Sequence, residues 1–198
     1  TKRPDFLEGY LALATIEELD GNELKAGPIF ERAIKAENAV IPKGFKGEIA
    51  WGYMANRFYL RLLFNYMRWL VRDGQIGKAI TLAKRQLRLN PEDNCGVRMD
   101  LPLYLAASGQ IDAAEKASGR LTKKGAWLDG HMLLILSLCK ILSDDLESGI
   151  YYFLRALFEL PVLRPIVEDE EIPDDFRDAE WKWHRGVIPD MESLWFHY

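Results

Sequence analysis

Apolar residues recur every three or four positions through most of the chain. The clearest run consists of Leu60, Leu63, Met67 and Leu70. This spacing places apolar side chains on one face of an α-helix, where they pack against a neighbouring helix. Sustained alternation of apolar and polar residues, the pattern of a half-buried β-strand, is absent from the sequence. The pattern therefore predicts an all-α fold with no sheet.

The helical segments repeat with a period of 35 residues. The turn at Gly74 has a near copy at Gly109, and a small residue recurs at Ala79, Ala114 and Gly149. Periods of this length are typical of stacked helix pairs, in which each copy buries the apolar face of its neighbour. The pattern predicts copies at about residues 7–40, 60–93, 95–128 and 130–163.

Larger residues keep a fixed distance from these small ones. Phe153 follows Gly149 by four positions, and Pro91 and Pro161 lie 70 positions, or two periods, apart. These columns resemble the tetratricopeptide repeat (TPR), which has a period of about 34 residues. The resemblance covers about two-thirds of the chain. It implies an αα-superhelix, a right-handed solenoid of about four helix pairs with a C-terminal cap.

A second set of residues resembles a group of largely uncharacterised bacterial TPR-like proteins. In that group a tryptophan-glycine and an asparagine-arginine precede a helix, and an Asn-Pro-x-Asp-Asn run followed by Gly-x-Arg begins the next pair. The matching residues here are Trp51, Gly52, Asn56, Arg57, Leu60, Arg61, residues 89–94, Gly96 and Arg98. The resemblance implies a scaffold that holds a partner, and no reaction.

Three segments depart from the repeat. Residues 38–54 are rich in glycine and proline, which indicates an insertion loop. Residues 162–175 carry two prolines and an acidic run, which is typical of a linker, and residues 176–198 are rich in tryptophan and other aromatic residues. We therefore expect a repeat domain over 1–163, followed over 164–198 by an acidic linker and short helices that cap the last repeat.

Basic residues form a stripe on the helix expected over about 54–73. Successive members are separated by four, four, three and four positions, which places all five on one face. The members are Arg57, Arg61, Asn65, Arg68 and Arg72. In TPR proteins the first helix of each pair lines the concave groove. The resemblance therefore implies a partner-binding groove made by this stripe together with Arg98, Trp51 and Asn56.

An arginine-rich groove favours an acidic partner. The planar guanidinium group holds a carboxylate with two hydrogen bonds, and an asparagine can fix a peptide backbone. We therefore expect the groove to bind an acidic or C-terminal peptide segment. The arrangement partly resembles the carboxylate clamp of some TPR domains, although Leu11, Thr15, Leu134 and Leu138 stand where clamp residues would continue.

Other roles are open to the same residues. The arginines can brace the insertion loop and the turn at Asp93 internally. The acidic run 168–171 can lie across them, because residues 43–89 carry a charge balance of +8 and residues 143–198 one of -9. The aromatic C-terminus offers another interaction surface, for example in a homodimer. Aromatic residues lie between the arginines, and such a surface is suited to binding nucleic acid. The net charge of -4 disfavours nucleic acid as the partner.

The sequence carries no pattern of catalysis. Cys95 and Cys139 lie 44 positions apart without a CxxC motif, and His131, His184 and His197 show no metal-ligand spacing. Phosphate-binding loops and nucleophile elbows are absent as well. We therefore expect no enzyme activity, no cofactor and no metal. Free cysteines favour a reducing, cytoplasmic compartment, and no apolar run reaches the ~20 residues of a membrane span.

Overall fold

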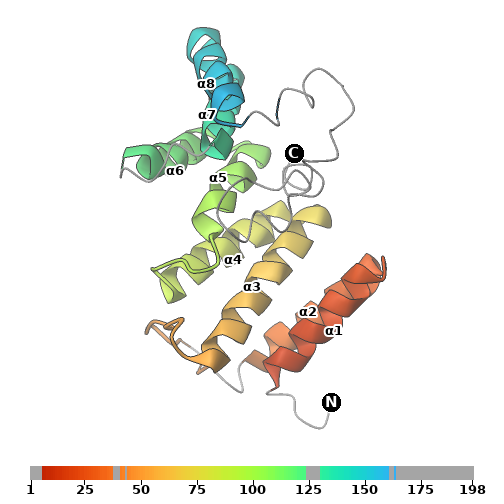
Figure 1. Cartoon of the computed structure of the whole chain (residues 1–198). Helices are drawn as coiled ribbons and strands as arrows, with labels where there is room; N and C mark the ends of the chain where they lie inside the picture. Colours follow the sequence, from red (N-terminus) through yellow and green to blue (C-terminus); the bar gives the residue numbers. More distant parts are fainter. Residues whose placement is uncertain (1–5, 38–40, 43, 124–129, 161–162, 164–198) are drawn as a thin grey trace. The chain divides into compact units, whose positions relative to one another are not determined.

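The computed structural model describes residues 6–37, 41–42, 44–123, 130–160 and 163 (Figure 1). Within these ranges the structure contains eight α-helices and no β-strand, as the sequence predicts. The helices fall into two units, Thr1–Ser108 and Gly109–Tyr198. The predicted linker and aromatic cap, residues 164–198, lie outside the described residues.

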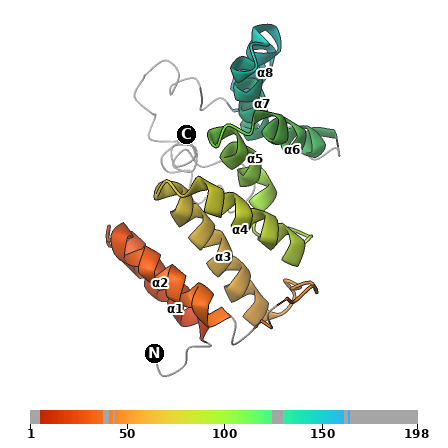
Figure 2. The same ribbon diagram turned by 180° about the vertical axis from the view of Figure 1, so that it is seen from behind.

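Five helices belong to the first unit. They are α1 (Leu7–Leu19), α2 (Glu23–Ala36), α3 (Met54–Arg72), α4 (Ile76–Leu89) and α5 (Val97–Ala107). The first hairpin, α1 and α2, packs against α3, while α4 packs against both α3 and α5. Figures 1 and 2 show α1 beside α2 and α3 beside α4 from opposite sides. α1 with α2 and α3 with α4 form the hairpins that the 35-residue period predicts for the first two copies.

The second unit contains the remaining three helices. They are α6 (Ile111–Lys123), α7 (Gly130–Leu142) and α8 (Leu146–Glu159), and α7 packs against both of the others. Leu133 of α7 is buried together with Ala156, Leu160 and Leu163 at the C-terminal end of α8. Among the described helices, none is both long and apolar enough to cross a membrane.

The first helix of each pair is followed by a residue whose backbone φ angle is positive, in the left-handed region. Gly21, Gly74 and Gly109 have φ values of +73°, +75° and +77°, a region that glycine enters without steric cost. Asp144, with φ of 61°, takes this place in the turn between α7 and α8. The turns that the sequence places at Gly74 and Gly109 are therefore confirmed.

Small residues occupy the positions where paired helices approach most closely. Ala79 is completely buried, and a Cβ atom added to Gly149 would lie 2.7 Å from Cγ1 of Ile141. Phe30 fills the space between α2 and α3, where its ring stacks on that of Tyr66 at 5.6 Å between centroids. This alternation of small and large side chains is the physical basis of the repeated columns.

Between α2 and α3, residues 41–42 and 44–53 form turns and irregular structure, and this stretch is anchored to the end of α4. The backbone N of Ile49 donates to the carbonyl of Leu89 at 2.6 Å, and the Asn90 amide donates to the Ile49 carbonyl at 3.2 Å. Arg88 adds a bond to the carbonyl of Phe45 at 3.3 Å. These bonds satisfy loop backbone groups and attach this stretch to α4.

Candidate functional site

The basic stripe of α3 lies opposite the face that packs into the core. Leu60, Leu63 and Met67 are completely buried on the core side. The stripe residues are exposed or half-buried: Arg57, Arg61, Asn65, Arg68 and Arg72. The helix is therefore amphipathic in the way that the spacing predicts, with its cationic side open to solvent.

Two residues at the N-terminal end of α3 hold the insertion loop. The Asn56 side-chain amide donates to the carbonyl of Ala50 at 2.8 Å, and Nε of Arg57 donates to the carbonyl of Trp51 at 2.9 Å. Hydrogen bonds from a charged donor contribute about 1.5–3 kcal/mol. The bracing role considered for this end of the stripe is therefore present in the structure.

The indole ring of Trp51 joins the first two arginines of the stripe. The guanidinium carbon of Arg57 lies 5.5 Å from the ring centroid, and that of Arg61 lies 5.4 Å from it. Both distances are within the range of a cation–π interaction. Trp51 thus restricts the directions in which these two cations can point.

The far end of the stripe and its neighbour on α5 also have internal partners. Arg72 forms an ion pair with Glu18 of α1. Arg98 donates to the carbonyl of Pro91, while its own backbone N donates to the Asp93 carboxylate at 2.8 Å. Arg72 and Arg98 are therefore tied to neighbouring elements of the first unit.

The middle of the stripe differs from both ends. Within the described part of the chain, the side chains of Arg61, Asn65 and Arg68 form neither an ion pair nor a hydrogen bond. Arg61 rests on Trp51, and Arg68 lies 5.9 Å from the ring centroid of Phe64. These three side chains keep their hydrogen-bonding groups for solvent or for a ligand.

A carboxyl group of α5 faces this middle region. Burial raises the pKa of Asp100 to about 6, while the charge of Arg68 and the hydroxyl of Tyr104 act in the opposite direction. The Tyr104 hydroxyl donates to Oδ2 of Asp100 at 3.3 Å. The pKa of Asp100 therefore lies near 6, and its carboxyl group is close enough to Arg68 to feel its charge.

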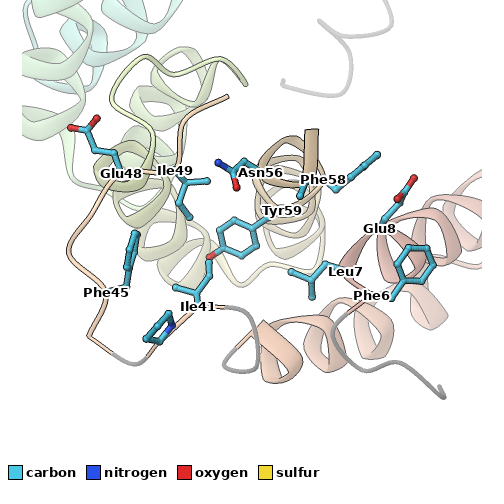
Figure 3. Close-up of a pocket in the computed structure, with 12 residues that line it drawn as sticks. Phe6, Leu7, Glu8, Ile41, Phe45, Glu48, Ile49, Asn56, Phe58 and Tyr59 are labelled. Atoms are coloured by element: carbon cyan, nitrogen blue, oxygen red, sulfur yellow. The ribbon is translucent and has the colours of Figure 1, made fainter. Parts of the chain in front are cut away.

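A pocket that the sequence did not predict lies between the insertion loop and the starts of α1 and α3 (Figure 3). Its volume is about 450 Å³. The lining is mostly apolar and consists of Phe6, Leu7, Glu8, Ile41, Pro42, Phe45, Glu48, Ile49, Ala55, Asn56, Phe58 and Tyr59. The sequence feature that could have indicated this pocket is the set of apolar residues within a loop rich in glycine and proline.

A polar cluster supports the wall of this pocket at Tyr59. Arg85 of α4 donates to the Tyr59 hydroxyl at 3.1 Å and forms a two-bond ion pair with Glu37, one bond of which measures 2.9 Å. Burial, followed by the Glu37 charge, raises the pKa of Tyr59. The hydroxyl is therefore neutral and fixed, and it presents the ring of Tyr59 as an apolar surface.

The cysteines do not have the surroundings of nucleophiles. Burial raises the pKa of Cys95 to about 11 and also raises the pKa of Cys139. A thiol with a raised pKa carries little thiolate at neutral pH. Across the described residues, no group of three metal-ligating side chains comes together.

The helix hairpins and their small-residue columns define a TPR-like αα-superhelix fold. The solved structure of YrrB, described as a TPR protein with an unusual peptide-binding site, is similar to this chain with a TM-score of 0.60. The two share 16% sequence identity, and the match covers 79% of this chain and 70% of YrrB. No protein-family model matches the sequence, and the search of curated proteins found no match. At this identity the similarity establishes the fold alone.

Proposed function

We propose that this chain is a non-catalytic scaffold that binds an acidic peptide segment along α3. The observation that carries the proposal is the middle of the stripe, where Arg61, Asn65 and Arg68 share one helix face and have no ion-pair or hydrogen-bond partner among the described residues. Exposed ion pairs stabilise a fold by only about 0–1 kcal/mol. Folding therefore gives little reason for this cluster, whereas a bound carboxylate would give the arginines a partner that suits their geometry.

The remaining residues of the predicted site hold this surface in place. Asn56 and Arg57 fix the insertion loop, and the loop places Trp51 beneath Arg61. Arg72 and Arg98 tie the surface to α1 and to the turn before α5. A site that is ordered before binding loses less conformational entropy when the ligand arrives, which increases affinity.

The similarity to YrrB supports a peptide as the class of partner, because that protein has the same fold and is described as having a peptide-binding site. The acidic character of the partner rests on the arginines alone. We place the scaffold in the cytoplasm, because Cys95 and Cys139 are free thiols, which are typical of a reducing compartment.

The test is binding of a fluorescein-labelled hexaglutamate peptide, followed by fluorescence anisotropy. Arg61→Glu with Arg68→Glu should weaken binding at least tenfold, since two attractive charges become repulsive. Raising the salt concentration should weaken binding to the wild-type chain. A matched control is Lys84→Glu with Lys116→Glu, two exposed lysines on other helices, which changes the net charge by the same amount.

The control variant should bind nearly as tightly as the wild-type chain. Circular dichroism should show the same helix content for all three proteins. Equal binding by the wild-type chain and the Arg61/Arg68 variant would exclude the α3 surface. An equal loss in the lysine variant would show that net charge alone, and no particular site, attracts the peptide.

The pocket beside the insertion loop favours a second binding function, for an apolar group. Its volume of about 450 Å³ is that of a small-molecule site, and most of its lining is apolar. Ala55→Trp should fill it, because Ala55 lines the pocket from the first turn of α3. Binding of the neutral dye Nile red should be lost in this variant and should not depend on salt, unlike binding of hexaglutamate. Unchanged dye binding would exclude the pocket.

A further inference from the structure

The charged side chains that line the pocket beside the insertion loop are acidic. Among the described lining residues they are Glu8, in the first turn of α1, and Glu48, in the loop, with no lysine or arginine among them. In the view of Figure 3 these two residues lie on opposite sides of Tyr59. Both are exposed, and within the described part of the chain neither forms an ion pair or a hydrogen bond. The two carboxylates are therefore available to a ligand.

The sign of this charge is opposite to that of the surrounding sequence. Residues 43–89 contain ten lysines and arginines but only two acidic residues, and Glu48 is one of the two. A general excess of acidic residues therefore does not explain why a carboxylate of this stretch lines the pocket.

The other polar side chains of the described lining leave acceptors for a ligand. The Asn56 side-chain nitrogen donates to the carbonyl of Ala50 at 2.8 Å, so the side-chain oxygen of Asn56 remains as an acceptor. The Tyr59 hydroxyl is already held by Arg85 at 3.1 Å. A ligand that donates hydrogen bonds, such as an ammonium group, matches this set better than a carboxylate does.

Aromatic rings supply much of the apolar part of the site. Phe6, Phe45, Phe58 and Tyr59 all line the pocket. The face of an aromatic ring attracts an organic cation, and such rings are used to recognise ammonium ligands. The rings and the carboxylates therefore favour the same class of ligand.

The starts of α1 and α3 act in the opposite direction. Both helices begin beside the pocket, and a helix N-terminus carries about half a positive charge. The two full negative charges of Glu8 and Glu48 exceed these partial charges. The electrostatic preference of the pocket is therefore for a cation.

We propose that this pocket binds a small organic amine in its protonated form. The apolar body of the ligand packs against the aromatic rings, and its ammonium group lies at the rim beside Glu8 or Glu48. The volume of about 450 Å³ is within the range of small-ligand sites. This inference rests on the pocket being the site for an apolar group proposed above, and it adds the charge of the ligand.

The test uses three ligands that share a naphthyl ring. Naphthylmethylamine is a cation at neutral pH, naphthylmethanol is neutral and naphthylacetate is an anion. Isothermal titration calorimetry on the full chain measures each dissociation constant, and binding that Ala55→Trp abolishes is assigned to the pocket. The amine should bind there at least tenfold more tightly than naphthylacetate, with naphthylmethanol between them.

Glu8→Gln with Glu48→Gln keeps the shape of the rim and removes its charge. This variant should bind the amine at least fivefold more weakly than the wild-type chain and should bind naphthylmethanol equally well. The matched control is Glu92→Gln with Glu147→Gln, which changes two exposed carboxylates outside the pocket and alters the net charge by the same amount. Its affinity for the amine should be that of the wild-type chain.

The neutral ligand separates failure of this inference from failure of the pocket itself. Naphthylmethanol bound in the pocket, with the amine binding no more tightly than naphthylacetate, would overturn the preference for a cation and leave an apolar site. Absence of pocket binding by all three ligands and by Nile red would overturn both proposals. Amine binding that persists in Ala55→Trp, or an equal loss of affinity in the Glu92/Glu147 variant, would also overturn the assignment of the amine to this pocket.

Discussion

The start of α3 and the middle of its basic stripe use polar residues in different ways. Near its start, Asn56 and Arg57 hold loop carbonyls, and Tyr59 is fixed by Arg85 and the Glu37 carboxylate. From one turn later, Arg61, Asn65 and Arg68 have no such partners within the described part of the chain. The same helix face thus passes from residues that stabilise the fold to residues that are open to a ligand. Substitutions at the start of α3 should therefore mainly affect stability, whereas those at Arg61, Asn65 and Arg68 should mainly affect binding.

The largest effect on stability should come from Arg85→Met. Loss of the Arg85 guanidinium group leaves the Glu37 carboxylate, whose side chain is only 9% exposed, without its ion-pair partner. Breaking a fully buried pair costs about 3–5 kcal/mol, and partial exposure of Arg85 reduces this, so we expect about 2 kcal/mol. Urea unfolding followed by circular dichroism measures the loss. Lys84→Met, an exposed position of the same helix, should change the free energy of unfolding by less than about 0.5 kcal/mol.

A smaller loss of stability should follow from Asn90→Ala. The side chain of Asn90 donates to the Ile49 carbonyl at 3.2 Å and accepts from the backbone N of Asn94 at 3.0 Å, and it is 3% exposed. Losing these bonds should cost about 1 kcal/mol, because both join neutral groups. Thermal unfolding measures the change, and Asn94→Ala, in the same turn, should have little effect. Equal losses in the two variants would contradict the anchoring role of Asn90.

Trp51→Ala should weaken hexaglutamate binding with little change in stability. A cation–π contact at an exposed site contributes about 0.5–1 kcal/mol, so removing the ring should weaken binding by about two- to fivefold. Trp51→Phe should recover part of this loss, because phenylalanine retains a ring that attracts cations. Anisotropy measures both affinities. Unchanged binding by Trp51→Ala would show that the indole has no part in positioning Arg61.

The smallest effect should be a pH dependence of binding at the middle of the stripe. Burial raises the pKa of Asp100 from its usual 3.8 to about 6. As the pH falls through 6, this carboxylate is neutralised, and Arg68 is left with less competing negative charge. Hexaglutamate stays largely ionised above its ordinary pKa of about 4.3. The wild-type chain should therefore bind it about two- to threefold more tightly at pH 5.5 than at pH 7.5.

Asp100→Asn is the matched variant for this prediction. It should bind the peptide more tightly than the wild-type chain at pH 7.5 and show a weaker pH dependence. The same raised pKa has a consequence for folding: the contribution of the Asp100 carboxyl to stability is present below its usual pKa of 3.8 and is lost as the pH rises through about 6. Urea unfolding at pH 5.5 and pH 7.5 should show that the free energy of unfolding decreases less with rising pH in the variant than in the wild-type chain.

The repeat is the part of the fold that the sequence predicts best. Its columns combine a small residue such as Ala79, a turn glycine such as Gly74 and the buried run from Leu60 to Leu70, and each has a local physical cause. Local spacing also places all five members of the stripe on one face of α3. Whether each arginine has a partner depends on residues distant in sequence, such as Glu18 for Arg72. Periodicity carries no information about such contacts.

The pocket was missed for a related reason. Its lining comes from three separate segments: the start of α1, the insertion loop and the start of α3. The loop follows neither a helical nor a strand period, and its course is set by bonds such as that between Ile49 and Leu89. Sequence reasoning identifies such a segment as an insertion, but it does not reveal the cavity that the segment encloses.

The attachment of the insertion loop to α4 has a consequence for how this protein can change during evolution. The loop lies between two repeat copies, and its bonds to Leu89 and Asn90 involve mostly backbone atoms. Residues such as Phe45 can therefore vary in size or polarity without altering the stacking of helices, because no column of the repeat contains them. A lineage of such chains could diversify its ligands through this one segment while the scaffold remained constant.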